Sequence, residues 1–117
     1  MSNVGGSVID VTQTVTTLCE VTIPNTGVYF VSAVVDPNLL GTEVGNANVC
    51  LALNSKNIAG AQVYFNNTSK AWFIGGCQVS AIVSCSKGDK IQFRGQSGGV
   101  NKWQAGDRRR LDAFRIG

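Results

Sequence analysis

The stretch Cys77–Gln96, CQVSAIVSCSKGDKIQFRGQ, decides the fold, because it holds two alternating segments on either side of a short turn. From Cys77 to Cys85 apolar side chains alternate with mostly polar ones, and the alternation resumes from Lys90 to Gln96. This period of two is typical of β-strands. The intervening Ser86-Lys87-Gly88-Asp89 consists of turn-forming residues. We therefore expect an antiparallel hairpin that anchors a β-sheet.

Similar alternating segments fill the rest of the chain, and none has a helical period. Runs rich in Gly, Asn or Pro, such as Pro24-Asn25-Thr26-Gly27, separate them as turns do. The expected strands outside the opening stretch cover residues 8–11, 16–23, 27–36, 46–55, 58–65, 70–74 and 110–116. About seven to nine short strands predict an all-β fold, a jelly-roll β-sandwich of two antiparallel sheets.

Length and composition indicate one domain. The chain has 117 residues, of which 44% are hydrophobic and 15% charged. Residues 1–7, MSNVGGS, are polar and Gly-rich, so we expect a flexible N-terminal arm followed by a single jelly-roll domain over residues 8–117. No run approaches the ~20 apolar residues of a membrane-spanning helix, and no signal peptide is visible, so we expect no membrane partner.

One expected strand is apolar on both of its faces. The segment 27–36, GVYFVSAVVD, has apolar side chains at both alternating positions. A strand of a sandwich buries only one face against its own core, so something else must cover the other face. A partner subunit is one candidate for that cover.

Catalysis is poorly supported by the residue types present. The chain has no His, so the commonest general base and the commonest metal ligand are both missing. Its seven acidic residues mostly fall in turns or at strand ends. We therefore expect no enzyme activity, no cofactor and no metal.

The four cysteines have the pattern of buried thiols. Cys19, Cys77 and Cys85 lie on the apolar parity of their strands, whereas Cys50 lies on the other, and their spacing matches no zinc motif. Free Cys behaves as a small hydrophobic residue. Free thiols in a reducing cytoplasm are the main expectation, and one or two disulfides are the alternative.

Positive charge gathers near the C-terminus. The net charge of +3 is too small to indicate nucleic-acid binding. Arg108, Arg109 and Arg110 form a cluster that is either a solvated loop or a docking site for an acidic partner. Trp103, in a polar Gly-rich loop, is a further candidate for contact with a partner.

Three segments, in order, span most of the chain: Pro24-x-x-Gly27-Val28-Tyr29-Phe30-Val31-Ser32, Ser86-Lys87-Gly88-Asp89-Lys90-Ile91-Gln92-Phe93 and Leu111-Asp112-Ala113-Phe114-Arg115-Ile116. They resemble the P-x-x-G-x-Y-x-F strand, the G-D turn with its following strand, and the closing F-S-G-F-x-L strand of tumour-necrosis-factor-like and complement-type globular head domains. Ala113 stands where that superfamily has glycine. The resemblance implies a jelly roll that forms a compact homotrimer with binding surfaces on its outside, and no enzyme activity.

On this resemblance we expect a non-catalytic trimeric module at a virion (phage) surface, a capsid decoration or cement protein on a protein lattice. The alternatives are a receptor- or glycan-binding head of a tail fibre or spike, and a secreted cytokine-like ligand. The expected trimer-interface residues are Tyr29, Phe93 and Phe114. The expected partner-binding residues come from the N-terminal arm and the basic end: Ser2, Asn3, Val4, Trp103, Arg108, Arg109 and Arg110.

Overall fold

The computed structural model describes residues 1–39, 46–66, 77–97, 103–106 and 109–117, and within them the regular structure is all strand. The strands are β1 (Ser2–Val4), β2 (Ile9–Val11), β3 (Thr16–Thr22), β4 (Gly27–Val35), β5 (Pro37–Leu39), β6 (Asn46–Leu53), β7 (Lys56–Asn66), β8 (Cys77–Cys85), β9 (Lys90–Ser97), β10 (Trp103–Ala105) and β11 (Arg110–Arg115). The strand expected over residues 70–74 lies outside the described residues.

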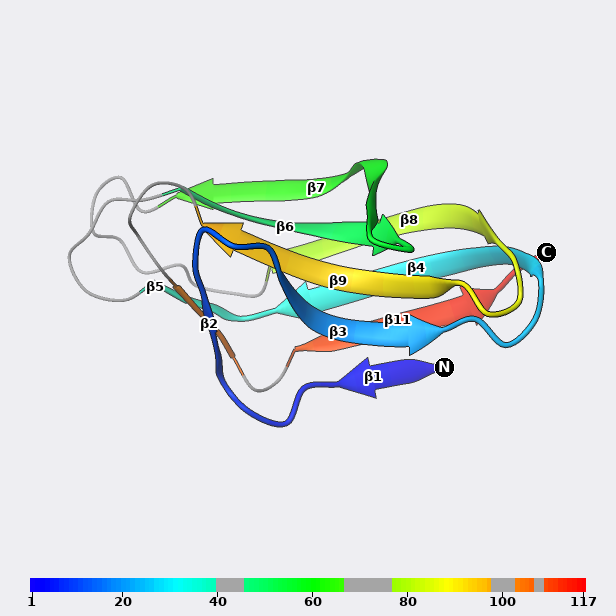
Figure 1. The fold of residues 1–117 in the computed structure, drawn as a ribbon, viewed down its shortest axis with the longest axis horizontal. Helices are drawn as coiled ribbons and strands as arrows, with labels where there is room; N and C mark the ends of the chain where they lie inside the picture. The colour runs from blue at the N-terminus through cyan, green and yellow to red at the C-terminus, as the bar shows by residue number, and fades with distance from the viewer. Residues whose placement is uncertain (40–45, 67–76, 98–102, 107–108) are drawn as a thin grey trace.

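The described strands pair in two four-stranded antiparallel sheets and one small sheet. We call the sheet with order β1-β11-β4-β8 the first sheet and the one with order β3-β9-β6-β7 the second sheet. Strands β2, β10 and β5 form the small sheet. In Figure 1 the two large sheets extend along the same long axis of the molecule, and both chain termini lie at the same end. The expectation of an all-β protein with two antiparallel sheets is confirmed.

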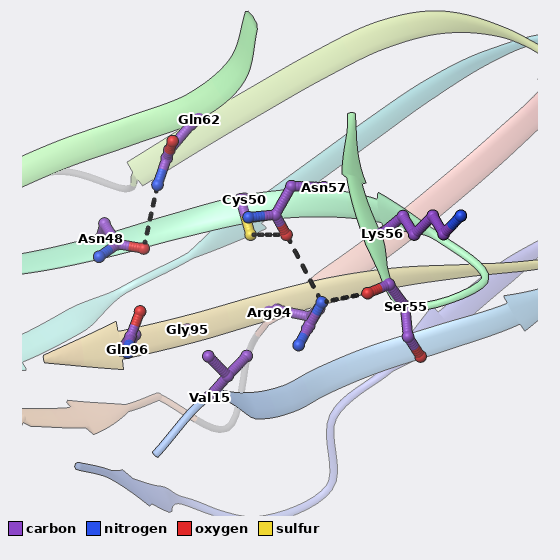
Figure 2. A pocket seen from close by; sticks show the side chains of 10 residues that line it. All are labelled: Val15, Asn48, Cys50, Ser55, Lys56, Asn57, Gln62, Arg94, Gly95 and Gln96. Carbon is purple, nitrogen blue, oxygen red and sulfur yellow. Dashed lines mark hydrogen bonds between the residues drawn. The ribbon is translucent and has the colours of Figure 1, made fainter. Parts of the chain in front are cut away.

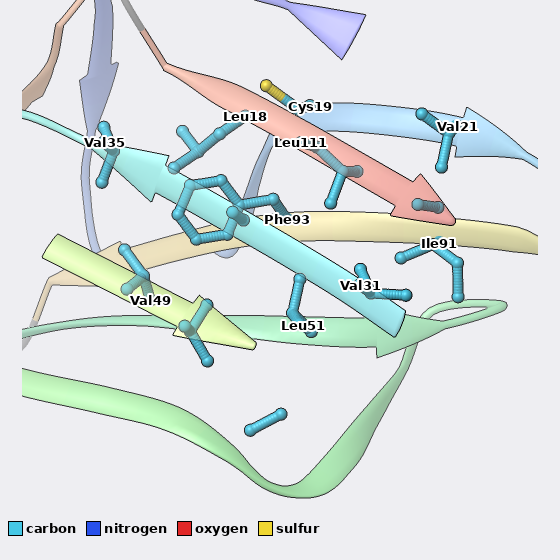
Figure 3. Packing of buried hydrophobic residues seen from close by; sticks show 14 of the residues in the cluster. Leu18, Cys19, Val21, Val31, Val35, Val49, Leu51, Ile91, Phe93 and Leu111 are labelled. Atoms are coloured by element: carbon cyan, nitrogen blue, oxygen red, sulfur yellow. The ribbon is translucent and has the colours of Figure 1, made fainter. Parts of the chain in front are cut away.

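The core lies between the two large sheets. Val31 and Leu111 come from the first sheet, Leu51 and Phe93 come from the second, and all four are fully buried (Figure 3). Burial follows the alternation of the sequence, because every second side chain of a strand points to the same face. Fully burying an aliphatic or aromatic side chain is worth about 1.5–3 kcal/mol, so these inward positions supply most of the driving force for folding.

The opening stretch is not a hairpin, which corrects the expectation from sequence. Strand β8 pairs with β4 in the first sheet, whereas β9 pairs with β3 and β6 in the second. The turn between them therefore crosses from one sheet to the other. Gly88, with φ of 91°, donates its N–H to the carbonyl of Ile23, so the turn packs against the connection that follows β3. Two strands that contribute to one core from opposite sheets have the same alternation as two paired strands.

A tight two-residue hairpin joins β6 to β7 instead. Asn54 and Ser55 have φ of 50° and 67°, the positive values at both central positions that a type I′ turn requires. The turn is held to β9, because the Asn54 side chain accepts a hydrogen bond from Lys90 N (2.9 Å) and donates one to Asp89 (3.1 Å). Sequence analysis treated residues 46–55 as one strand and missed this turn.

Two further segments differ from the expectation of loops. Residues Pro37–Leu39 form β5, and Trp103–Ala105 form β10, which lies between β2 and β5 in the small sheet. Within the second sheet, a bulge in β3 turns Leu18 inward together with Cys19, although the two residues are adjacent in sequence. Such a bulge inserts one extra residue into a strand and is invisible to a strict count of two.

Residues 2–4 form a strand and not an arm without regular structure. Strand β1 pairs with β11 in a register that places Ser2 opposite Asp112 and Val4 opposite Arg110. The amide of Gly5 continues the pairing by donating to the carbonyl of Arg109 (2.9 Å). The polar composition of this segment fits its position, because all three strand residues are exposed at the edge of the first sheet.

Candidate functional site

The outer face of the first sheet carries a row of exposed apolar side chains. Ile82 of β8, Phe30 of β4 and Phe114 of β11 are direct neighbours in the sheet register. Their exposed fractions are 66%, 39% and 54%. Direct cross-strand neighbours have their Cβ atoms about 4.5–5.5 Å apart, so the three side chains form one contiguous strip across the sheet. We call these three residues the apolar row.

Further apolar groups extend the surface around this row. Val4 and Ile116 are exposed, and Val28 and Val34 on the same face of β4 are half-buried. Arg110 lies between Val4 and Val34 in the register, which gives this end of the face a charged margin. The two-sided apolar pattern of residues 27–36 therefore corresponds to one core-facing side and one solvent-facing side of β4. Large exposed apolar patches mark interaction surfaces.

Only one of the three residues expected at a trimer interface lies on this face. Phe114 is exposed, as an interface residue must be in the free chain. Tyr29 and Phe93 are instead buried in the core, and the Tyr29 hydroxyl donates to the carbonyl of Asn25 (2.7 Å). The expectation that these two residues form a subunit contact is therefore wrong, because both side chains point inward between the two sheets. Phe30 and Ile82, which sequence analysis did not select, occupy the outward positions.

The expected basic docking cluster is divided by the fold. Arg108 lies outside the described residues. Arg110 is exposed, but its Nε donates to Asp112 Oδ2 at 2.7 Å, which raises the pKa of its guanidinium above the ordinary value. Arg109 has only 5% of its surface exposed and is not a surface docking residue. Arg109 and Arg110 therefore do not form one charged surface patch.

Arg109 holds the N-terminal segment against the sandwich. Its Nε donates to the carbonyl of Leu18 (2.8 Å), and its Nη1 donates to the carbonyls of Ser7 and Gly106. These three acceptors come from parts of the chain that are far apart in sequence. A buried guanidinium is tolerated where its N–H groups find acceptors, so Arg109 has a structural role.

The remaining expected partner-binding residues are at the surface or are described only in their backbone. Ser2, Asn3 and Val4 are exposed on the edge strand β1. An edge strand offers unpaired backbone groups to a partner, which keeps this segment available as a contact. Trp103 lies in β10 between two strands and not in a loop, and its side chain is outside the described part of the structure.

The outer face of the second sheet has the opposite character and contains a polar groove. The groove has a volume of about 320 Å³ and is lined by Val15, Asn48, Cys50, Ser55, Lys56, Asn57, Gln62, Arg94, Gly95 and Gln96. Most of these side chains are amides or cations, so we call it the amide groove. Sequence analysis missed it, because polar residues at alternate positions of 46–53 and 90–97 looked like an ordinary solvated face.

A bulge in β7 shapes the amide groove. Residues 58–61 have no partner in the β6–β7 register, which runs from Asn57 directly to Gln62, and Gly60 has φ of 79°. The groove lies over Cys50 at this irregularity, and Figure 2 shows the Asn57 oxygen between the Cys50 sulfur and the Arg94 guanidinium, linked to both. The Asn57 Oδ1 atom accepts from Cys50 Sγ (3.3 Å) and from Arg94 Nη1 (3.5 Å).

All four cysteines are buried and unpaired in this structure, as the alternation predicts for three of them. Burial raises the pKa of each thiol above its ordinary value, because the thiolate would lose hydration. Low thiolate content and poor access both disfavour thiol chemistry. Within the described ranges no group of three or more Cys, Asp or Glu side chains is arranged to hold a metal ion.

Comparison with protein-family models and with curated proteins finds no match to this chain. Among the residues that the structure describes there is no helix of the length and apolarity needed to cross a membrane.

Proposed function

We propose that this chain is a non-catalytic homotrimeric module with a jelly-roll fold of the tumour-necrosis-factor-like type, and that it serves as a capsid decoration or cement protein on a virion. The observation that carries the proposal is the apolar row of Ile82, Phe30 and Phe114 on the outer face of the first sheet. A solvent-facing strip of this kind on a β-sandwich calls for a protein partner.

The order of strand pairing supports the jelly-roll part of the proposal. Without the small sheet, eight strands remain, and they pair in a nested manner: β1 with β11, β3 with β9, β4 with β8 and β6 with β7. The first strand thus pairs with the last, and each following pair lies inside the previous one. A chain folded back on itself and wrapped into two sheets has this order, which is characteristic of jelly rolls.

Self-association is the use that we propose for the apolar row. Burial of apolar surface contributes about 25 cal/mol per Å², and the row offers three large exposed side chains. The next row of the same face is polar and consists of Ser80, Ser32 and Asp112, of which Asp112 already pairs with Arg110. A closed ring of identical copies buries the same patch on every subunit. The trimer in particular rests on the resemblance of three segments to head domains that form homotrimers.

Light scattering after size exclusion tests this part of the proposal. The wild type should have about three times the 12.3 kDa chain mass. Ile82→Asp and Phe114→Asp place a charge on the apolar row and should give monomers that still fold. Tyr64→Asp is the matched control, because Tyr64 is 72% exposed on the opposite sheet. A wild type that is monomeric at micromolar concentration contradicts the proposal.

Attachment to a capsid lattice would use the edge of the first sheet beyond the apolar row. The exposed strand β1 and Arg110 lie together there. The Arg110–Asp112 pair is a surface ion pair, and such pairs contribute little to stability, so an acidic lattice group can replace Asp112 as the partner of Arg110. Three copies on one module would add avidity to contacts that are individually weak.

The amide groove favours a second candidate function, the receptor- or glycan-binding head of a tail fibre or spike. Its polar lining suits a ligand that forms hydrogen bonds and not a second copy of the chain. Immunogold electron microscopy of virus particles, with antibody raised against the purified protein, separates the two candidates. Label over the shell supports decoration, and label at fibre or spike tips supports the binding head. Particles without label contradict both.

A further inference from the structure

We propose that the amide groove binds a saccharide that carries a carboxylate, such as a uronic acid or a sialic acid. The inference specifies a ligand for the binding-head candidate above. It depends only on residues of one chain's second sheet, so it does not require the trimer. The groove also stays accessible in a trimer formed through the first sheet, because the two sheets present opposite outer faces.

The charge of the lining selects an anion. Arg94 and Lys56 line the groove, and no acidic residue is among its described lining. Glu20 lies on the same outer face, but it contacts Lys90 at 3.8 Å and accepts a hydrogen bond from Gln92. A carboxylate that enters the groove therefore meets cationic groups without a competing acid from its lining.

Arg94 is positioned to bind a carboxylate through two nitrogen atoms. Its Nη1 donates to the carbonyl of Ser55 (3.0 Å) and to Asn57, which fixes the plane of the guanidinium. Within the described residues its Nε and Nη2 atoms have no acceptor. These two atoms form one edge of the guanidinium, which matches the two oxygens of a carboxylate. Because the guanidinium is already held in place, less conformational entropy is lost on binding.

The other groups suit the hydroxyl groups and the ring of a sugar. Asn48 and Gln62 carry amides, which both donate and accept hydrogen bonds. The hydrogen bond from Gln62 Nε2 to Asn48 Oδ1 is long, at 3.4 Å, so a ligand can replace it. Tyr64 lies directly opposite Asn48 in the register and is largely exposed. Its ring offers an apolar face for the C–H groups of a pyranose. The volume of about 320 Å³ lies at the lower end of small-molecule sites, which fits one or two sugar rings.

Nuclear magnetic resonance titration of the labelled protein with trigalacturonate and 3′-sialyllactose tests the proposal. We expect shifts of the Arg94 and Asn48 signals at millimolar ligand concentration. Methyl-esterified trigalacturonate and lactose are the matched neutral probes and should bind about tenfold more weakly or worse, because a charge-assisted bidentate contact is lost. Inorganic phosphate is the probe for an anion site without sugar specificity.

Variants connect the binding to the groove. Arg94→Gln should weaken binding of the acidic sugar at least about tenfold and remove the preference over the ester. Lys87→Gln is the control, since it removes the same charge from an exposed turn residue outside the groove. Tyr64→Ala should weaken binding, whereas Tyr64→Phe should retain it. Light scattering of each variant should give the wild-type mass, so a failure of the trimer is seen separately.

The proposal is overturned by any of three results. The first is equal binding of trigalacturonate and its methyl ester. The second is that inorganic phosphate alone shifts and saturates the same groove signals as the acidic sugar does. The third is that neither acidic saccharide shifts the groove signals. An Arg94→Gln variant that binds as the wild type does, with its fold intact, has the same effect.

Discussion

The buried guanidinium of Arg109 offers a direct test of how the N-terminal segment is attached. Arg109→Met keeps most of the side-chain volume but removes the donors to the carbonyls of Leu18, Ser7 and Gly106. A buried acceptor left without a donor costs about 1–3 kcal/mol. The bond to Leu18 is buried, and the bonds to Ser7 and Gly106 are partly buried and should each cost less. Loss of the charge offsets part of this cost, because the guanidinium no longer has to be desolvated. We expect a net loss of about 2–4 kcal/mol.

Urea denaturation at fixed protein concentration measures this loss. A small domain has a slope of about 1–3 kcal/mol per molar urea, so the midpoint should fall by about 1–2 M. The domain should remain folded in water, because total stability is typically about 5–15 kcal/mol. An Arg109→Met variant with an unchanged or higher midpoint would refute the assigned role of the three hydrogen bonds.

Two neighbouring glycines give a matched pair for the same site. A Cβ at Gly5 would lie 2.6 Å from both Cγ and Nε of Arg109, whereas a Cβ at Gly6 would have nothing within 4 Å. Gly5→Ala must therefore displace the guanidinium and should destabilise the fold, while Gly6→Ala should be neutral or slightly stabilising. In the Arg109→Met background Gly5→Ala should cost less. Additive effects in this double-mutant cycle would contradict the proposed contact.

Three further predictions concern the thiols, the last strand and the inter-sheet turn. Burial raises the pKa of all four thiols, so their contribution to stability is full below the ordinary pKa of 9.0 and is lost as the pH rises through the folded-state pKa. Thiol titration should find four reactive groups only in denaturant. Fewer than four groups in denaturant without reductant would indicate disulfides. Deletion of residues 110–117 removes the buried Leu111 and the strand that lies between β1 and β4, so circular dichroism should show no cooperative melting. A truncated chain that still melts cooperatively would contradict this prediction. Hydrogen bonds from Ser86 N (2.8 Å) and from Asn54 lower the pKa of Asp89. The contribution of Asp89 to the stability of the fold is therefore present above the ordinary pKa of 3.8 and is lost as the pH falls through the folded-state pKa. If Asp89→Asn leaves the acid titration of stability unchanged, this role is contradicted.

Local alternation predicted most strands but not their partners. The bounds of β3, β4, β8, β9 and β11 lie within one or two residues of the expected segments. The pairing of Cys77–Cys85 with Lys90–Gln96 was wrong, because a short turn can connect two strands within one sheet or across two. The tight hairpin at Asn54–Ser55 was missed, because it depends on positive φ at residues other than glycine. Pairing depends on contacts between residues that are distant in sequence, which a single sequence does not contain.

The candidate sites show the same division between local and long-range information. The alternation in β4 correctly indicated an apolar outward face. Tyr29 and Phe93 were nevertheless expected at a subunit contact together with Phe114, whereas both are buried in the core and Phe30 and Phe114 are exposed. The three consecutive arginines looked like one patch, but the structure buries Arg109 and exposes Arg110. The amide groove brings together β6, β7 and β9, so no single segment of sequence could have revealed it.

The two outer faces differ in the free-energy cost of covering them with a partner. Covering the second sheet would desolvate the amides of Asn48 and Gln62 and the guanidinium of Arg94. Each such group costs about 1–3 kcal/mol, or more for a charge, unless the partner supplies a matching hydrogen bond. Covering the apolar row gains free energy for each Å², and the three side chains of the row themselves need no such match. These costs are consistent with our two proposals, a flat protein partner on the first sheet and, in the groove of the second sheet, a ligand whose polar groups meet the amides and Arg94 individually.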